Sequence, residues 1–275
     1  MSPFAFTCLL PVCSGDDPKA FLEATRSVET STLVPDEILI CQDGRLPMKL
    51  AQVVEDLLDR PRYRLSVNQG RPGLHHNLNA AVLRARTPWI ARMDADDLNL
   101  PDRFAAQVAF LAANPGVDVL GGAILEVAPD GSRRRRMTPL AHHQIVGRVR
   151  WRSPMNHMTV FMRRETLLAA GGYPGIARKE DYALWLRMIA MGVIFANLPQ
   201  DLVEVRLGRD FARRRTGLAS VGSEFRLYEM RRRLAGAGGL LDAAVFLARA
   251  AALSSSGPSA LLYKTVLRGP ALGSA

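Results

Sequence analysis

The sequence contains few cysteines and no long apolar run. Cys8, Cys13 and Cys41 are odd in number and lack the spacing of zinc ligands, so we expect reduced thiols and neither a disulfide framework nor a zinc site. No stretch reaches the roughly 18 apolar residues of a membrane-spanning helix, and the first residues lack the basic and apolar regions of a signal peptide. The sequence therefore predicts a cytoplasmic protein, either soluble or peripheral at the inner face of the cell membrane.

Aromatic residues are also scarce, at 7% of the chain, and the basic run "RRRR" at 133–136 contains none. Proteins that bind nucleic acid strands interleave basic residues with exposed aromatic side chains, on which the bases stack. We therefore expect no nucleic-acid partner, and a basic nucleic-acid-binding module on a nucleotide-binding scaffold stays only as an alternative. The run follows "PDGS" and is predicted to be a solvated hairpin tip, with phosphate binding as the alternative.

Positive charge is concentrated in the second half of the chain. Residues 1–130 contain 12 Lys and Arg against 17 Asp and Glu, whereas residues 131–275 contain 24 against 9. This asymmetry predicts that the C-terminal half faces something anionic, such as a phosphorylated molecule or an anionic membrane surface.

Short apolar runs alternate with helical patterns through the first 113 residues. The apolar runs end at turn residues such as Pro11 or Asp43-Gly44, and the segments between them have apolar residues at helical spacing. This order predicts an α/β fold with a Rossmann-like, mostly parallel sheet flanked by helices. The expected strands are 4–13, 36–44, 63–70, 88–97 and 117–121, and the expected helices are 16–28, 48–60, 74–86 and 101–113.

The composition of the sequence changes near residue 206. A helix is expected over 179–192, and it is followed after 206 by a basic loop and helical patterns at 218–235, 240–253 and 259–268. These C-terminal helices mix apolar and basic residues, as helices in an anionic membrane interface do. A helical cap packed on the core with a solvated basic face is the equal alternative. We therefore expect a domain over 1–205 and a C-terminal helical extension over 206–275.

Three aspartates crowd into the stretch "IARMDADDLNLPDRF" at 90–104. A chain with 16 aspartates is expected to contain about one Asp-x-Asp pair by chance, so the pair alone is weak evidence. However, Asp94 and Asp96 follow an expected strand, and ligands bind at the carboxyl ends of parallel strands. Residues at i and i+2 of an extended segment point to the same side. The pair is therefore a candidate ligand site, while Asp97 either supports that site or caps the turn before the next helix.

Four stretches of the chain form a combined pattern. In chain order they are "LLPVCSGDD" (9–17), "DEILICQDG" (36–44), "IARMDADDLNLPDRF" (90–104) and "GYPGIARKEDYALWLRM" (172–188). Together they resemble the family 2 glycosyltransferases of the GT-A fold, in particular bacterial enzymes that build exopolysaccharide, lipopolysaccharide or capsule. The resemblance covers about residues 5–205. It implies transfer of a sugar from a nucleoside-diphosphate sugar, with inversion, to a glycan or a polyprenyl-linked acceptor. A sugar-1-phosphate nucleotidyltransferase is the enzymatic alternative, but "PVCSGDD" lacks the glycine-rich loop of that class.

The resemblance assigns donor-binding roles to the first half of the chain. Pro11 and Val12 match the segment that lies against the nucleotide base, and Asp43 matches the acid that binds the N–H edge of the base. Asn79 falls in the region that closes over base and ribose, although helix capping or packing explains it equally well. Asp94 and Asp96 match the family's Asp-x-Asp motif. The resemblance implies that Asp94 binds the ribose and that Asp96 binds a divalent cation, Mg²⁺ or Mn²⁺, shared with both phosphates.

The resemblance assigns acceptor-side roles to the second half. Asp181 matches the catalytic base, and Glu180 precedes it; the alternative is that both acids only complement the dipole of a helix. His157 could contact the diphosphate or the acceptor, Trp185 could stack on an acceptor sugar, and a core position is equally expected for both. Arg209 on the basic loop is a candidate for folding over the diphosphate, with a solvated loop as the alternative.

Overall fold

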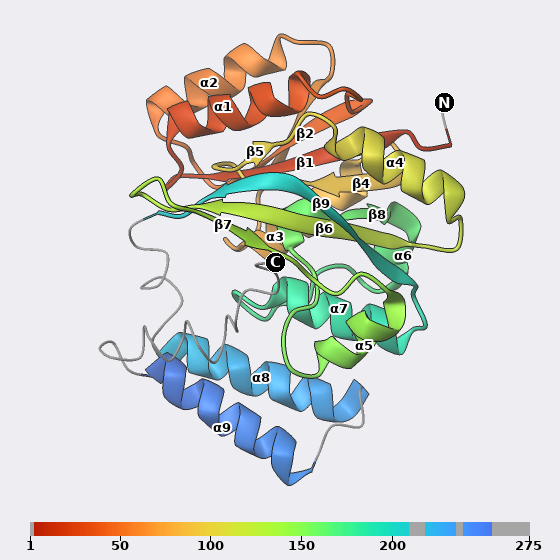
Figure 1. Ribbon diagram of the computed structural model, residues 1–275. Coiled ribbons are helices and arrows are strands. Elements are labelled where there is room, and N and C mark those ends of the chain that lie inside the picture. The colour runs from red at the N-terminus through yellow and green to blue at the C-terminus, as the bar shows by residue number, and fades with distance from the viewer. Residues whose placement is uncertain (1–2, 209–217, 235–238, 255–275) are drawn as a thin grey trace.

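Nine strands within residues 3–208 form one mixed sheet, which is the middle layer of the molecule (Figure 1). The computed structural model describes residues 3–208, 218–234 and 239–254. The strands are β1 (Phe6–Cys13), β2 (Glu37–Asp43), β3 (Tyr63–Asn68), β4 (Trp89–Arg92), β5 (Leu98–Asn99), β6 (Val119–Val127), β7 (Arg133–Arg136), β8 (Phe161–Arg163) and β9 (Phe195–Arg206).

The sheet is parallel on one side and mixed on the other. Its strand order is β3-β2-β1-β4-β8-β6-β9-β5, with β7 paired to β6. The strands from β3 to β4 are parallel, as the alternation of strands and helices predicts. β8 is antiparallel to both β4 and β6, and β5 is antiparallel to β9. The expected parallel pairing is therefore complete in the first half, whereas in the second half only β6 and β9, among the described strands, pair in parallel. The antiparallel pairs were not predicted because antiparallel neighbours need no crossover helix that the sequence pattern would reveal.

Helices cover both faces of the sheet, and α8 and α9 form a further layer beyond α7 (Figure 1). The predicted cap of the first helix is present, since the Asp17 side chain accepts from the Ala20 N–H at 2.8 Å and Pro18 begins the helix. The helices are α1 (Pro18–Glu29), α2 (Met48–Leu58), α3 (Leu74–Arg84), α4 (Arg103–Ala113), α5 (His142–Val149), α6 (Arg164–Ala169), α7 (Glu180–Ala190), α8 (Leu218–Leu234) and α9 (Leu240–Ser254), with a 3-10 turn η1 at His157–Thr159.

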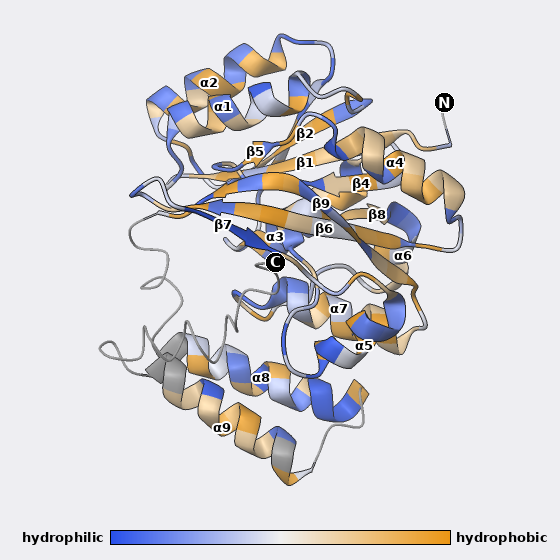
Figure 2. Ribbon diagram, in the orientation of Figure 1, coloured by the Kyte–Doolittle hydropathy of each residue, from blue (hydrophilic) through white to orange (hydrophobic). Residues whose placement is uncertain are grey.

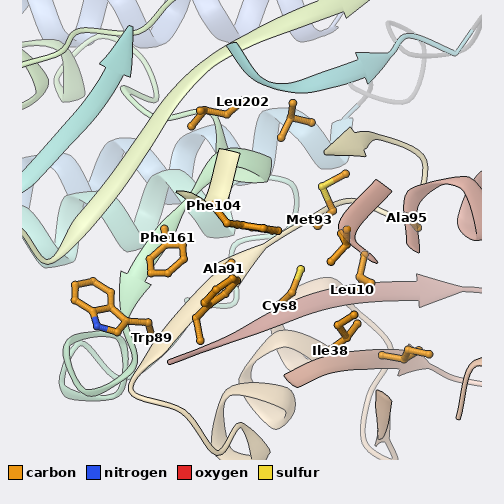
Figure 3. Packing of buried hydrophobic residues seen from close by; sticks show 14 of the residues in the cluster. Cys8, Leu10, Ile38, Trp89, Ala91, Met93, Ala95, Phe104, Phe161 and Leu202 are labelled. Carbon is orange, nitrogen blue, oxygen red and sulfur yellow. The ribbon is translucent and has the colours of Figure 1, made fainter. Parts of the chain in front are cut away.

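Two apolar clusters hold the layers together. The first packs β1, β2 and β4 against α1, α2 and α4, and Figure 3 shows Trp89 and Phe161 beside Phe104 in it. The second packs the other face of the sheet against α3, α5, α6 and α7. Buried strands carry apolar residues on both faces, as parallel strands covered by helices require. Figure 2 shows these strands coloured mainly as hydrophobic.

The arginine run at 133–136 is a strand and not a hairpin tip. Its residues form β7, which pairs antiparallel with β6. In this pairing Ile124 lies opposite Arg136, and Val127 lies opposite Arg133. The tip lies just before it, where the Ala128 N–H donates to Ser132 O at 2.9 Å. The prediction was wrong because a strand at the sheet edge can consist of exposed charged residues without any apolar alternation.

The C-terminal helices pack on the rest of the chain. Leu227 of α8 is fully buried and belongs to the second apolar cluster, together with Tyr182 of α7. The expected helices at 218–235 and 240–253 correspond to α8 and α9, whereas 259–268 lies outside the described residues. Among the helices that the structure describes, none combines the length and the apolar character of a membrane span.

Candidate active site

A cavity of about 670 Å³ lies where the ends of β1, β2 and β4 approach the start of α7. Its lining includes the loops that follow these three strands. The loop at 70–73 contributes indirectly, because the Gly73 N–H donates to Asp43 Oδ2 at 2.9 Å. The strand ends therefore gather around one cavity, as expected for the carboxyl edge of a parallel sheet.

Pro11, Val12 and Asp43 are among the residues that line this cavity. The carboxylate of Asp43 is held at both oxygens, because Asn68 Nδ2 donates to Oδ1 at 2.8 Å and the Gly73 N–H donates to Oδ2. These two contacts fix the orientation of the side chain, and each oxygen keeps a lone pair that can accept from a ligand N–H.

The three aspartates of the strand-end cluster line the same cavity, above a buried arginine. Arg92, at the end of β4, is only 3% exposed and its Nη2 pairs with Asp94 Oδ1. Burial, followed by the charges of Asp94 and Asp16, raises the pKa of Asp96 above its usual value. Asp94 and Asp96 therefore differ electrostatically, since Asp94 has a cationic partner and Asp96 sits among like charges.

Asp97 supports the cluster from the protein interior. It is 2% exposed, and burial together with the charges of Asp94 and Asp96 raises its pKa well above the usual value. Its Oδ1 accepts from the Arg206 N–H of β9 at 3.3 Å, and its Oδ2 has no hydrogen-bond partner among the described residues. Asp102, not Asp97, occupies the N-cap position of α4. The helix-cap reading of Asp97 is thus wrong.

Glu180 and Asp181 face the aspartates from the first turn of α7, and both line the cavity. Glu180 is 8% exposed, and burial followed by the charge of Asp181 raises its pKa to about 7. Asp181 is half-buried. The two neighbouring acids therefore lie in different environments, with Asp181 the more accessible one.

His157 lines the cavity as a buried, neutral imidazole. Its Nε2 shares a hydrogen bond of 3.1 Å with Tyr173 Oη, and burial followed by the charge of Arg92 holds its pKa well below the usual value. The ring of Trp185 packs edge-on at 6.0 Å between centroids. Trp185 itself has no exposed surface and lies in the second apolar cluster. It is a core residue that supports His157, and the expected stacking on an acceptor sugar is wrong.

Asn79 also has a structural role. Its Nδ2 donates to Tyr173 O at 3.0 Å, and its Oδ1 accepts from the Tyr173 N–H at 2.7 Å. Both ends of the amide are therefore engaged with the backbone of the segment before α7, and the side chain does not line the cavity. The packing alternative applies, and the base-binding role is dropped. Arg209 lies outside the described residues.

Several arginines that line the cavity were not predicted from the sequence, among them Arg92, Arg148, Arg152 and Arg178. Arg92 carried a usable signal, because it is a charged residue at the end of the otherwise apolar strand "WIAR", two positions before Asp94. The other three carried none, because basic residues are common throughout the second half of the chain.

Residues 8–174, more than half of the chain, match the family model described as Glycosyl transferase family 2. The chain belongs to glycosyltransferase family 2. The amylovoran biosynthesis glycosyltransferase AmsE of Erwinia amylovora is 32% identical to this family 2 chain over 244 residues, which cover 89% of the chain and 92% of AmsE. The UDP-Gal:alpha-D-GlcNAc-diphosphoundecaprenol beta-1,3-galactosyltransferase of Escherichia coli is 30% identical over 226 residues, covering 80% and 81% respectively.

Solved glycosyltransferase structures share the fold of this family 2 chain. Staphylococcus aureus TarS, residues 1–349, superimposes with a TM-score of 0.65 at 15% identity, covering 94% of this chain and 74% of that one. The mannosyltransferase PcManGT from Pyrobaculum calidifontis, solved with GDP-Man and Mn²⁺, gives 0.62 at 19% identity, covering 96% and 79%. The predicted family, GT-A fold and enzyme class are therefore confirmed, and the chain is a glycosyltransferase.

Proposed function

We propose that this glycosyltransferase uses a divalent cation to bind a nucleoside-diphosphate sugar and transfers the sugar with inversion to a hydroxyl of an acceptor. The observation that carries the proposal is the meeting of two acidic groups in one cavity, Asp94 and Asp96 at the strand ends and Asp181 on α7. Pro11, Val12 and Asp43 line the same cavity and would bind the base of the donor.

The strand-end carboxylates fit a cation that is shared with phosphates. A divalent cation would relieve the repulsion that raises the pKa of Asp96, and the unpartnered Oδ2 of Asp97 lies in the same cluster. No group of three or more His, Cys, Asp or Glu in the described ranges is arranged to enclose a metal ion. One or two carboxylates suffice for Mg²⁺ or Mn²⁺ when phosphates supply the other ligands. Such a cation would neutralise charge that develops on the departing diphosphate.

Asp181 is the group that would accept the proton of the acceptor hydroxyl. In this step the acceptor oxygen bonds to the anomeric carbon, its proton passes to the Asp181 carboxylate, and the bond from the anomeric carbon to the diphosphate oxygen breaks. The nucleoside diphosphate leaves with the electron pair of that bond. Attack opposite the leaving group inverts the anomeric centre. Glu180 is the poorer candidate for the base because it is only 8% exposed, whereas Asp181 is half-buried and more accessible to an acceptor.

The acceptor of this proposal is a glycan or a lipid-linked saccharide of cell-surface polysaccharide synthesis. Support comes from the names of two relatives, one an amylovoran biosynthesis enzyme and the other a galactosyltransferase acting on a diphosphoundecaprenol-linked sugar. Peripheral binding of α8 and α9 to an anionic membrane surface would bring the cavity to such an acceptor. Exposed Phe225 and Leu247 lie on these helices, and α8 also carries the exposed Arg226 and Arg232.

The donor part of the proposal is tested by isothermal titration of nucleoside diphosphates into the full chain. We expect one nucleotide among UDP, GDP and dTDP to bind in Mn²⁺ and to lose at least tenfold in affinity in EDTA. Asp96→Asn should remove most of the Mn²⁺ dependence, whereas the exposed Asp59→Asn, which makes the same change away from the cavity, should not. If no nucleotide binds under either condition, the proposed donor site is wrong.

A further inference from the structure

The helix α8 holds the segment that leads into α7, against which it packs (Figure 1). Lys179 is the N-cap residue of α7, and its Nζ pairs with Glu224 Oε2 of α8 at 3.4 Å. The preceding residue, Arg178, donates from Nη1 to Ser220 Oγ at 2.9 Å. Ser220 and Glu224 are four residues apart and therefore lie on the same face of α8. One face of α8 thus contacts the two residues that lead into the turn of Asp181.

The backbone of this segment needs contacts of this kind. Among the described residues, Arg178 is the one non-glycine residue with a positive φ, which is 62°. This left-handed region is unfavourable for a residue with a Cβ, and such a conformation persists where the surrounding structure holds it. The local sequence therefore does not fix the path of the chain into α7 by itself.

Glu224 is fully buried and is not among the residues that line the cavity. Its Oε1 pairs with Arg249 Nε of α9 at 2.6 Å and with Arg231 Nη2 at 3.8 Å. Burial acts to raise the pKa of Glu224, but the charges of Arg249 and Lys179 act in the opposite direction and hold this pKa below its usual value. Glu224 is therefore ionised at neutral pH, and it can affect a reaction in the cavity only through its partners.

The two arginine partners of this carboxylate also hold the loop after α5. Arg231 Nη1 donates to Arg150 O at 2.9 Å, and Arg249 Nη1 donates to Trp151 O at 2.7 Å. Residues of this loop and of the start of α7 both line the cavity. The carboxylate therefore connects two segments of the cavity lining that are distant in the sequence.

A buried ionic cluster of this kind fixes geometry more than it adds stability. The cost of removing charges from water offsets much of their attraction, whereas the contacts themselves require defined distances and directions. A general base must lie within hydrogen-bond reach of the hydroxyl it deprotonates. A displacement of about 1 Å in a reacting group can lower a rate by roughly a hundredfold. Contacts that hold the start of α7 therefore bear directly on the rate of transfer.

We propose that Glu224 is a positioning residue of the transfer reaction, which through Lys179 and Arg249 sets the place of Asp181 relative to the acceptor hydroxyl. This inference rests on the proposed function for the identity of Asp181 as the base. The C-terminal helices then govern the rate of transfer through a residue that touches no reactant.

The first test compares transfer of labelled sugar to lipid acceptors at a temperature at which each variant is folded. In Glu224→Gln the turnover number should fall about tenfold, while the dissociation constant of the bound nucleotide stays within about twofold, because only the position of the base changes. Lys179→Met removes the same contact from its other end and should also slow transfer. The double variant should transfer at the rate of Glu224→Gln alone, since two changes to one contact are not additive.

Two controls separate positioning from charge and from stability. Glu229→Gln makes the same change on α8 at a residue that does not line the cavity, and it should transfer at the wild-type rate. Leu57→Ala in α2 opens a cavity in the apolar core and lowers the free energy of unfolding without contacting the site. The folded form of Leu57→Ala should also transfer at the wild-type rate.

The second test is independent of catalysis and measures amide hydrogen exchange in α7. The Ala183 N–H donates to Lys179 O at 2.9 Å, so it reports on the first turn of this helix. This amide should exchange about tenfold faster in Glu224→Gln than in the wild type, and not in Glu229→Gln. The side chain of Lys179 is 22% exposed, so Lys179→Met provides both measurements should Glu224→Gln fail to fold.

Four results would each overturn the inference. They are wild-type transfer or unchanged Ala183 exchange in Glu224→Gln, an equal loss of transfer in folded Leu57→Ala, a parallel loss of nucleotide affinity in Glu224→Gln, and additive losses in the double variant. Slow transfer by Asp181→Asn together with wild-type transfer by Glu224→Gln rejects only the positioning role. Wild-type transfer by Asp181→Asn rejects the proposed base, and the positioning role with it.

Discussion

The adjacent carboxyls of Glu180 and Asp181 differ because only Glu180 is buried. Burial disfavours the charged form of a carboxyl, and the neighbouring negative charge adds to this effect. The pKa of Glu180 near 7 means that the folded protein holds its proton more tightly than the unfolded chain does. The cost of ionising Glu180 in the folded state is absent below the unfolded pKa of about 4.5 and complete above the folded pKa of about 7.

We expect Glu180→Gln to stabilise the protein at alkaline pH relative to acidic pH. The substitution removes the ionisation cost, so the free energy of unfolding should rise by about 2–3 kcal/mol more at pH 8.5 than at pH 4. Urea unfolding of both proteins across this range measures the difference. A free energy difference that does not vary with pH would contradict the raised pKa.

The sequence predicted residues whose type and place both mark a ligand site. Asp94 and Asp96 were found because they end an apolar strand, and the cavity does contain them. The packing alternative applies to Asn79 and Trp185; the sequence left it open because a helix pattern does not tell which neighbour its side chains meet. Arg92 was missed because its buried position depends on contacts between segments that are distant in sequence.

The first four strands and the first four helices could be read from the sequence because each combines one period with clear end signals. β6 was expected only to residue 121, yet it continues to Val127. Gly121 and Gly122 obscured the continuation of this strand in the sequence, since glycine normally weakens a strand. In the structure a Cβ on Gly121 would meet Asn197 Oδ1 and Met155 Cε, so the glycine is required by close packing against other segments. Such a requirement exists only in the folded protein.

The helices α8 and α9 combine packing on the core with an exposed apolar surface. Phe225 is 49% exposed and Leu247 is 63% exposed, while Leu227 is buried against α7. The helices therefore cap the core, as one reading of the sequence predicts, and the membrane-interface reading stays a prediction.

We predict that vesicles containing phosphatidylglycerol co-sediment this protein more strongly than vesicles of neutral lipid. Replacing Phe225 and Leu247 together by serine should lower the partition coefficient at least tenfold, since burying each apolar side chain contributes on the order of 2 kcal/mol. Leu83→Ser, at a residue of α3 that is 67% exposed, is the matched control. Equal binding by the double variant and the wild type would exclude α8 and α9 as the contact surface.

The uneven charge of the whole chain has a structural counterpart. The acidic first half supplies the strand-end aspartates of the cavity, and the basic second half supplies most of the arginines that line it. One cavity therefore contains both acidic and basic side chains. The sequence located the asymmetry but assigned it to an external partner, because charge counts do not tell which residues the fold brings together.

The central claim is that Asp181 removes the acceptor proton in a reaction whose donor is held by the strand-end aspartates. Transfer of labelled sugar from the bound nucleotide-sugar to lipid acceptors in a bacterial membrane extract tests this most directly. In Asp181→Asn we expect transfer to fall by about 10² to 10⁴, the range of a lost general base, while the donor dissociation constant stays within about twofold because the substitution conserves shape. Asp59→Asn should transfer at the wild-type rate. Transfer by Asp181→Asn at the wild-type rate would contradict the account.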